Sequence, residues 1–359
     1  MRVGIVTFHW ASNYGAVLQT YALQSYLESM GCDVAVIDYR PSWAKDNQIP
    51  HIGFRLGNIL GFIDHYIRKF QFNRFRNKYL NLTRRYRQED TINDFEAVIV
   101  GSDQVFNPDI IARKGQPDTV YLLTTVGDNI RRLSYAASFG NSTLGKNYHN
   151  IFKQLLQSFR NISIRENSGQ KIIENLGLRA QTVPDPTILY GNFNRLTIHN
   201  AKPEEEYILN FIFQKRETVT MVQNTVAIES ARKICSIGGL YEKIIHRKTL
   251  YALSPEKWIN TIQNAHFVIT DSFHSTVFCI LYHRPFISLE LNGWGGDWSE
   301  RIKALLRETG LESRLLISPT QQTVKEIYHS PIDWEEVECR LKKWRQRGEI
   351  FLKESLGII

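Results

Sequence analysis

The order of apolar segments in the first forty residues is the feature that most restricts the fold. Residues 2–7 form a short apolar run. After the polar loop 8–15, apolar residues recur at helical spacing until Gly31, a typical residue just beyond a helix end. A second apolar run follows at 33–38. A strand, a helix and a strand in this order predict an α/β protein with a parallel sheet covered by helices.

The alternation continues along the chain and is interrupted once. Further strands are predicted at 97–101, 133–138, 162–165 and 182–184, and a second set at 207–213, 243–246, 266–270 and 285–289. A long helix is predicted after the strand at 207–213, reaching about residue 237, and a charged helix at 334–352. The segment 190–206 is polar and lacks periodicity. We therefore predict two parallel-sheet domains facing a cleft, 1–190 and 191–359, with a C-terminal helix able to pack back on the first domain.

Composition restricts the environment of the protein. No uncharged apolar stretch approaches the roughly 20 residues that cross a bilayer, and residues 1–10 are too short and polar for a signal peptide. The four cysteines form no CxxC pair, which favours a reducing cytoplasm: Cys32, Cys235, Cys279 and Cys339. No zinc, calcium or P-loop spacing is present, so no metal and no cofactor are expected.

The net charge of +8 includes a strongly basic segment at about 50–90, inserted in the first domain. Its cations are Arg55, Arg68, Lys69, Arg74, Arg76, Lys78, Arg84, Arg85 and Arg87. Apolar residues interleave with them, and Asp64 is the one carboxylate between residues 55 and 87. Three interpretations remain open: contact with an anionic membrane surface, binding of nucleic acid, or a helix that packs its apolar side on the domain.

A histidine follows one of the predicted strands at a position suited to anions. The run ending at Thr270 is followed by Asp271 and Ser272, either of which can cap the next helix. His274 then lies in the first turn, among free backbone N–H groups at the positive end of the helix dipole. Such a histidine can bind phosphate and exchange protons, or it can serve only as a structural cap.

Two further charged residues follow predicted strands. Arg165 closes the strand at 162–165, where a guanidinium can pair with a carboxylate or phosphate, or with the neighbouring domain as a salt bridge. Asp103 follows the apolar run at 97–101 and can accept a hydroxyl proton or cap a turn. Asp185, between two prolines, is expected to shape a turn, with a role in the cleft as the lesser alternative.

The first loop, 9–15, offers aromatic and amide groups suited to a sugar and lacks the GxGxxG pattern of dinucleotide sites. By itself this loop is only weakly informative.

Seven segments together resemble the polysaccharide pyruvyl transferase family. They are 7–23 (TFHWASNYGAVLQTYAL), 101–108 (GSDQVFNP), 135–140 (YAASFG), 163–169 (SIRENSG), 183–187 (VPDPT), 268–285 (VITDSFHSTVFCILYHRP) and 299–314 (SERIKALLRETGLESR). They occur in the family's order and cover most of the chain. The set is specific, although no single motif is decisive.

The resemblance implies two Rossmann-like domains similar to the glycosyltransferase B fold, with phosphoenolpyruvate as donor. The cysteines and the basic segment lead us to expect a cytoplasmic protein, either free or peripheral at the inner membrane face. The donor would be held by the second domain together with a guanidinium, and the acceptor by the first domain. The acceptor would be a glycan or a lipid-linked oligosaccharide, and the product a pyruvate ketal. The resemblance suggests Arg165 and His274 as donor-binding residues, with His274 as the acid. Our hypothesis adds Ser272 and Phe273 to the donor side and Asp103, or alternatively His9, as the catalytic base. The expected acceptor-binding residues are His9, Asn13, Tyr14, Gly15 and Gln104.

The chain departs from the family at one position, and two other functions remain open. Some members have Arg-Leu-His-Gly where this chain has 272–275, so Ser272 replaces an arginine for which Arg284 is a candidate substitute. The nearest rival is a glycosyltransferase of similar fold that uses a nucleotide sugar. The other is a non-catalytic protein that binds anions or nucleic acid, although nucleic acid is not the expected partner because it gives no reason for Arg165 and His274 to follow strands.

Overall fold

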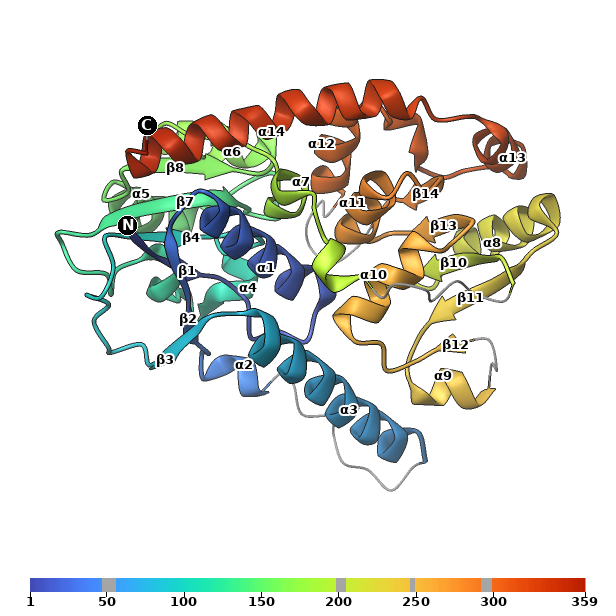
Figure 1. The fold of residues 1–359 in the computed structure, drawn as a ribbon, viewed down its shortest axis with the longest axis horizontal. Helices are drawn as coiled ribbons and strands as arrows, with labels where there is room; N and C mark the ends of the chain where they lie inside the picture. Colours follow the sequence, from blue (N-terminus) through green and yellow to red (C-terminus); the bar gives the residue numbers. More distant parts are fainter. Residues whose placement is uncertain (47–55, 198–204, 246–248, 292–298, 359) are drawn as a thin grey trace.

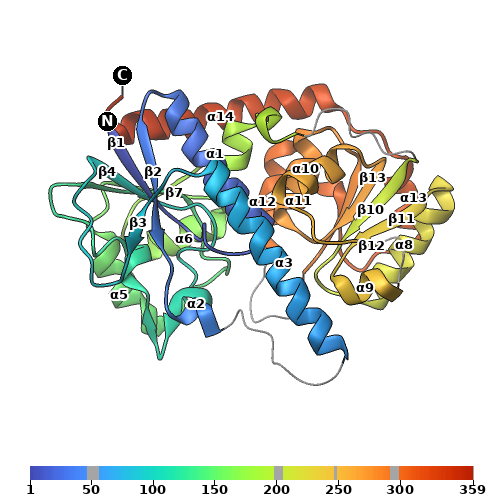
Figure 2. The ribbon, with the colours of Figure 1, turned by 60° about the horizontal axis from the view of Figure 1, so that its bottom comes forward.

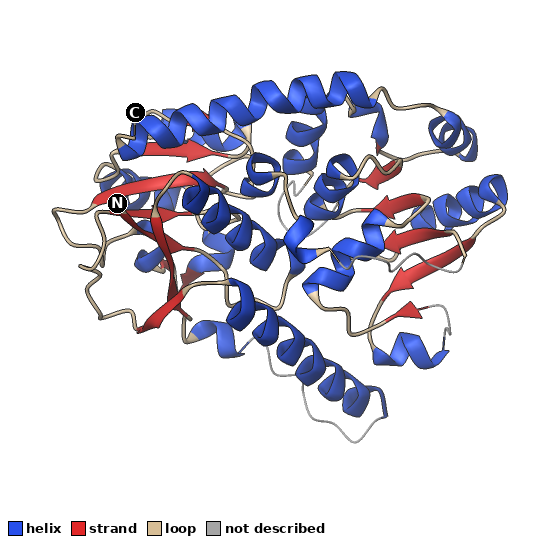
Figure 3. Ribbon diagram, in the orientation of Figure 1, coloured by secondary structure: helices blue, strands red, loops and turns tan. Residues whose placement is uncertain are grey.

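The computed structural model describes residues 1–46, 56–197, 205–245, 249–291 and 299–358. Two parallel sheets lie side by side, each surrounded by helices (Figures 1 and 3). The predicted fold class, two parallel-sheet α/β domains, is confirmed. The connection between the sheets runs from the end of β9 (Gln181–Thr182) to the start of β10 (Tyr207–Phe211). We propose residues 190 and 191 within it as the domain boundary.

The first sheet has seven strands in the order β3-β2-β1-β4-β7-β8-β9. Their bounds are Leu82–Tyr86, Asp33–Tyr39, Arg2–Val6, Ala97–Val100, Arg131–Ala137, Asn161–Ile164 and Gln181–Thr182. The central strands are continuous apolar runs because helices cover both faces of the sheet, and all four residues of β4 are buried. The strand order reverses between β1 and β4, which pair in parallel from Val3 with Ala97 to Val6 with Val100.

The second sheet has the order β12-β11-β10-β13-β14-β15. Its bounds are Thr249–Leu250, Lys233–Ile237, Tyr207–Phe211, Phe267–Thr270, Phe286–Leu289 and Leu315–Leu316. Here the order reverses between β10 and β13. Both sheets therefore have the topology in which ligands bind beyond the carboxyl ends of the strands at the point of reversal.

Two sequence predictions in the second domain are wrong. The helix expected to reach residue 237 is α8 (Glu217–Ser230), which ends where Ala231 adopts a left-handed φ of 51°, and the residues after it form β11. The strand expected at 243–246 is helix α9 (Leu240–Ile245), begun by the Glu242 carboxylate accepting from the Gly239 amide at 3.1 Å. His246 lies outside the described residues.

The two domains pack through helices of both. Tyr14, in α1 (Tyr14–Ser29), stacks on Trp258, in α10 (Pro255–Gln263), with ring centroids 5.0 Å apart. The C-terminal helix α14 (Trp334–Leu356) contacts α12 (Glu300–Thr309) of the second domain as well as β7 and α7 (Pro186–Tyr190) of the first. Figure 1 shows α14 running along both domains.

The basic segment forms helix α3 (Leu56–Tyr79) and the edge strand β3, while residues 50–55 lie outside the described part. Phe72 and Phe75 are buried in the hydrophobic core to which both domains contribute. Figure 2 shows α3 crossing the front of the molecule between the two domains, and it contacts α1, α9 and α10. Among the described residues, no helix combines the length and apolarity needed to span a bilayer.

Candidate active site between the two sheets

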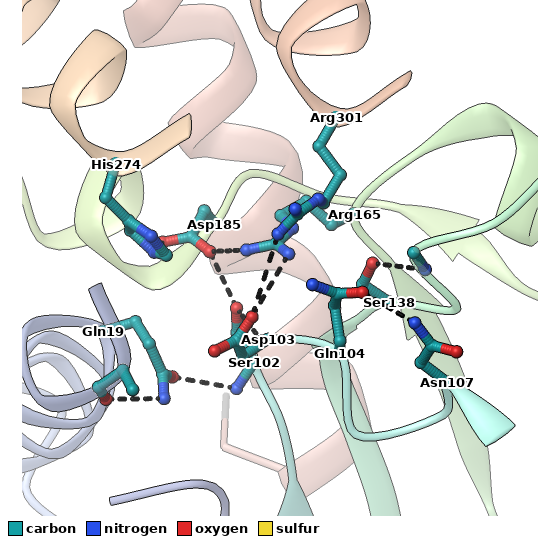
Figure 4. Close-up of polar contacts among 12 residues, drawn as sticks. Gln19, Ser102, Asp103, Gln104, Asn107, Ser138, Arg165, Asp185, His274 and Arg301 are labelled. Atoms are coloured by element: carbon teal, nitrogen blue, oxygen red, sulfur yellow. Dashed lines mark hydrogen bonds and ion pairs between the residues drawn. The ribbon is translucent and has the colours of Figure 1, made fainter. Parts of the chain in front are cut away.

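The loops at the two strand reversals meet between the sheets. Helix α1 follows β1, and helix α11 (Phe273–Leu281) follows β13. The first turns of these helices touch at Gly15 and His274, since a Cβ on Gly15 would lie 2.0 Å from the His274 Nδ1. The carboxyl ends of both sheets therefore border one polar cluster, drawn in Figure 4.

Arg165, directly after β8, occupies the centre of this cluster. Its Nη1 donates to the Asp185 Oδ2 at 2.7 Å, and its Nη2 lies 3.7 Å from the Asp103 Oδ1 (Figure 4). The residue is only 3% exposed. Burial alone would lower the pKa of Arg165, but the carboxylates of Asp185, Asp103 and Glu166 outweigh it and raise the pKa. The guanidinium is therefore a fixed cation.

Asp185 connects the elements of the cluster. Its Oδ1 caps α7 by accepting from the amide and hydroxyl of Thr187, and its Oδ2 also accepts from the Ser102 hydroxyl at 2.7 Å. Burial would raise the pKa of this carboxyl, but Arg165, His274 and the hydrogen bonds from Thr187 and Ser102 together outweigh burial and lower the pKa to about 2. The turn expected at Asp185 is present, and the same side chain also holds Arg165.

His274 completes the link between the domains. Ser272, the N-cap residue of α11, accepts from the Ser275 amide, so His274 lies in the first turn as expected. The His274 Nε2 is 3.9 Å from the Asp185 Oδ1. Burial, only partly opposed by Asp185 and Asp103, lowers the pKa of His274 to about 4. The imidazole is therefore neutral at pH 7 in the protein without ligand.

A second guanidinium, not singled out from the sequence, lies beside Arg165. Arg301, in the first turn of α12, has its Nη1 4.0 Å from the Asp103 Oδ1 (Figure 4). The Phe273 ring lies 4.5 Å from the Arg165 Cζ and 6.0 Å from the Arg301 Cζ. Arg284, the candidate from the sequence, instead donates from Nε to the Tyr282 carbonyl. The one available signal was that Arg301 falls in the family-like segment 299–314.

The loop after β4 brings in Asp103 and Gln104. Asp103 has a left-handed φ of 72°, and its amide is fixed by the Ser102 hydroxyl at 2.6 Å. Its side chain is 16% exposed, more than those of Arg165 and Asp185. Gln104 is anchored at Oε1 by the Asn107 amide group at 2.7 Å. Figure 4 shows both side chains on the side of the cluster where Arg301 lies.

Several polar atoms of the cluster are buried without a hydrogen-bond partner among the described residues. They are the Nε and Nη2 of Arg165, the Nε2 of His274 and the Oε2 of Glu166. Burial raises the pKa of Glu166, whose other oxygen accepts from Ser138 and the Phe139 amide. Buried polar atoms are nearly always paired, so this concentration is typical of a ligand site.

The helix dipoles favour an anion here. Besides α7, which Asp185 caps, four helices begin within or next to the cluster: α1 with Gly15, α6 (Asn167–Asn175) with its N-cap Glu166, α11 with Ser272, and α12 with Arg301. Each contributes partial positive charge from its first-turn N–H groups. Two guanidinium groups and these helix ends surround the Asp103 and Asp185 carboxylates.

Three residues expected at the acceptor side have other contacts. His9 is fully buried, with Nδ1 3.2 Å from the Thr7 carbonyl and Nε2 3.0 Å from the Asp38 Oδ1. Asn13 is the exposed N-cap of α1 and accepts from the Ala16 amide. Tyr14 packs between the domains, and its hydroxyl donates to the Leu253 carbonyl. Of the first loop, Gly15 is the residue placed against the cluster.

Other kinds of site are less well supported in this molecule. Across the described ranges, no group of three or more His, Cys, Asp or Glu side chains could hold a metal ion. A surface depression lined by Arg2, Asp33 and Asn81 lies at the opposite, amino-terminal edge of β1 and β2.

Solved structures similar to this chain support the fold. The UDP-GlcNAc 2-epimerase from Neisseria meningitidis bound to UDP-GlcNAc is 9% identical, with a TM-score of 0.55 over 99% of each chain. The UDP-GlcNAc 2-epimerase from Methanocaldococcus jannaschii is 12% identical, with a TM-score of 0.51 over 98% of this chain and 99% of the other. At such low identity the likeness concerns the fold alone.

Sequence comparison identifies the family. No curated protein sequence matches the chain. The family model for polysaccharide pyruvyl transferase matches residues 13–293, which include Gly15, Asp103, Arg165, Asp185 and His274. The chain therefore belongs to the polysaccharide pyruvyl transferase family.

Proposed function

We propose that the protein transfers a pyruvyl group from phosphoenolpyruvate to two hydroxyls of one sugar, forming a ketal and releasing phosphate. One observation carries this proposal: Arg165 of the first domain and His274 of the second both approach the Asp185 carboxylate, at 2.7 and 3.9 Å. A small anion held there would contact both domains. Family membership supports pyruvyl transfer to a polysaccharide.

The donor matches the two guanidinium groups of the cluster. Phosphoenolpyruvate is a compact polyanion with a carboxylate and a phosphate whose second pKa is about 6. Because Asp185 occupies the Arg165 Nη1, the Nε and Nη2 atoms would bind one of these anionic groups in a bidentate pair. Arg301 would bind the other, in place of the arginine that Ser272 replaces, with the first-turn amides of α11 nearby.

The reaction can be written with this donor and no redox step. A proton added to the methylene carbon makes C2 an oxocarbenium centre, and the first sugar hydroxyl attacks C2. The bond from C2 to the phosphate oxygen then breaks, and its electron pair leaves with phosphate. The second hydroxyl attacks the new oxocarbenium centre and closes the ketal. The two hydroxyl protons balance the proton gained by the methyl group and the one taken up by phosphate.

His274 is the proposed acid. The imidazole is neutral without ligand, because burial lowers its pKa to about 4. A polyanion next to the ring favours the imidazolium and would raise the pKa toward neutrality. Binding of the donor would then cause His274 to take up the proton that the methylene carbon of the donor needs. Proton donation by a histidine to the methylene carbon would raise the rate by about 10² to 10⁴, which is typical of general acid catalysis.

Asp103 is the proposed base on the acceptor side. Its carboxylate lies at the carboxyl end of β4, in the first domain, and is more exposed than its neighbours. Replacing it in Asp103→Asn keeps the shape and removes the basic oxygen. We expect turnover to fall by roughly 10² or more, with donor binding preserved; unchanged acceptor kinetics would remove Asp103 from this role.

The acceptor is proposed to be a glycan or lipid-linked oligosaccharide. All four cysteines are free in the structure, which supports action in a reducing cytoplasm.

The direct test is phosphate release from phosphoenolpyruvate across galactosides, glucosides and N-acetylhexosamines, followed by the mass of the product. Pyruvyl transfer predicts equimolar phosphate and a product heavier by one pyruvate less one water. A glycosyltransferase would instead consume a nucleotide sugar and lengthen the acceptor by one sugar. Transfer from a nucleotide sugar without phosphate release from phosphoenolpyruvate would overturn the proposal.

A further inference from the structure

Helix α3 exposes a stripe of large apolar side chains. Ile59, Ile63, Tyr66 and Phe70 are 48%, 40%, 53% and 64% exposed. Their spacing of four, three and four residues places them on one face of the helix. Soluble proteins rarely expose such a contiguous row unless it contacts a partner or a membrane.

This stripe is distinct from the face by which α3 packs on the protein. Phe72, Phe75 and Arg76 are the buried residues of its carboxyl-terminal half. The Arg76 Nη1 donates to the carbonyls of His9 and Ala11, both at 3.3 Å. The packing interpretation of the basic segment therefore explains one side of the helix and leaves the apolar stripe unexplained.

Cations border the stripe. At 100° per residue, Lys69 lies on one flank of the stripe and Arg74 on the other, and both are exposed. Neither forms an ion pair with another of the residues that the structure describes. Asp64, the carboxylate of this helix, faces the second domain, since a Cβ on Gly239 would lie 3.2 Å from its Oδ2. An apolar row between basic flanks is the pattern of a helix that lies in the surface of an anionic membrane.

We propose that α3 seats the protein on an anionic lipid bilayer, with the stripe of Ile59, Ile63, Tyr66 and Phe70 in the interfacial region and Lys69 and Arg74 at the headgroups. Charge complementarity favours lipid over a second copy, because a symmetric dimer through this face would oppose like charges. The aliphatic members of the stripe favour lipid over nucleic acid, which is bound through cations and aromatic stacking.

Membrane binding through α3 would also orient the proposed active site relative to the bilayer. The Arg68 Nη2 donates to the Ser12 carbonyl at 3.3 Å, and Arg76 holds His9 and Ala11, so α3 is attached to the loop that leads to Gly15. If the proposed function holds, a lipid-linked acceptor would lie in the same membrane to which α3 binds. Membrane binding itself does not depend on that function.

The test is flotation of the full-length protein with vesicles of phosphatidylcholine alone or mixed equally with phosphatidylglycerol. We expect flotation with the mixed vesicles, weakened by salt, and little with phosphatidylcholine. The double variants Ile63→Glu/Phe70→Glu and Lys69→Glu/Arg74→Glu should each lose binding by about tenfold or more.

The matched control is Ile228→Glu/Ile350→Glu, at apolar side chains that are 75% and 54% exposed on other helices. This variant should float like the wild type. Equal losses in the control, unchanged flotation of the α3 variants, or no flotation of the wild type would each overturn the proposal, as would a stripe variant that changes only the oligomeric mass. Phosphate release with a water-soluble acceptor should be unchanged in the α3 variants. The phosphate assay therefore tests the catalytic proposal, and flotation tests membrane binding, independently of each other.

Discussion

The imidazole of His274 lies directly against the backbone of Gly15, where a Cβ on residue 15 would come within 2.0 Å of Nδ1 and 2.5 Å of Cε1 and Cγ. Two helices from different domains thus meet at their first turns because residue 15 has no side chain. The position of the proposed acid therefore depends on a glycine of the other domain.

Gly15→Ala should inactivate the enzyme without unfolding it. The added methyl group overlaps the ring, so the imidazole or one of the two helices must move. Small misplacement of a catalytic group is enough to lower turnover by about 10². Phosphate release measures the loss, and circular dichroism checks the fold.

Gly61→Ala is the matched control for this glycine. Gly61 is also helical, and a Cβ there meets no atom within 4 Å. This variant should keep full turnover and gain up to about 1 kcal/mol of stability from helix propensity. Wild-type turnover in Gly15→Ala would show that the contact does not position His274.

The buried histidine should make the protein sensitive to mild acid. Folding lowers the pKa of His274 from 6.5 to about 4. Between these values the unfolded chain takes up a proton that the folded protein does not, so stability is full above pH 6.5 and falls as the pH decreases toward 4. His9, whose pKa burial also lowers, acts in the same direction.

Urea unfolding at pH 7 and pH 5 measures this effect. His274→Asn should reduce the stability lost between the two pH values by about 1–2 kcal/mol. An identical pH dependence in the variant and the wild type would mean that His274 titrates normally in the folded protein.

Asp185→Asn should cost both stability and activity. The substitution removes the negative charge next to the buried Arg165 guanidinium while the hydrogen bonds to Ser102 and Thr187 are weakened. Breaking a buried ion pair typically costs about 3–5 kcal/mol. Ser102→Ala removes one hydrogen bond to the same carboxylate and the one that its hydroxyl accepts from the Asp103 amide, and should cost less, about 1–2 kcal/mol. Equal stability of Asp185→Asn and the wild type in denaturant unfolding would contradict this ion pair.

Arg301 and Arg284 should differ in their effect on the donor. Arg301→Ala removes a guanidinium 4.0 Å from Asp103 and should raise the KM for phosphoenolpyruvate by roughly tenfold or more. Arg284→Ala removes a side chain bonded to the Tyr282 carbonyl and should leave that KM unchanged. The opposite result would restore Arg284 as the substitute for the missing arginine.

The sequence predicted the strands best where helices cover both faces of the sheet. The runs that became β1, β4 and β13 are apolar apart from Arg2 and Thr270 at their ends, and a polar residue follows each of them within two positions. The prediction of helix over residues 231–237 is wrong because β11 is only partly buried, and apolar periodicity does not separate helix from strand in such a segment. The two-residue strand β15 was too short to give a pattern.

The positions of three site residues after strands were predictable from the sequence, but the contacts among the site residues were not. Arg165, Asp103 and His274 stand where polar residues follow apolar runs, and the structure brings the three together. Nothing in the helical pattern of α12 distinguishes Arg301 from its other cations. The link from Asp185 to Arg165 depends on how the loop before α7 lies against β8, which sequence spacing does not specify.

The most direct test of whether Arg165 and His274 bind one donor is a calorimetric titration. Phosphoenolpyruvate is titrated into the wild type, Arg165→Gln and His274→Gln. UDP-N-acetylglucosamine serves as the competing ligand, and thermal melting confirms that each variant is folded. We predict that the wild type binds phosphoenolpyruvate and not the nucleotide sugar, and that each variant loses at least about tenfold in affinity. Binding of the nucleotide sugar alone, or phosphoenolpyruvate affinity unaffected by either substitution, would contradict this prediction.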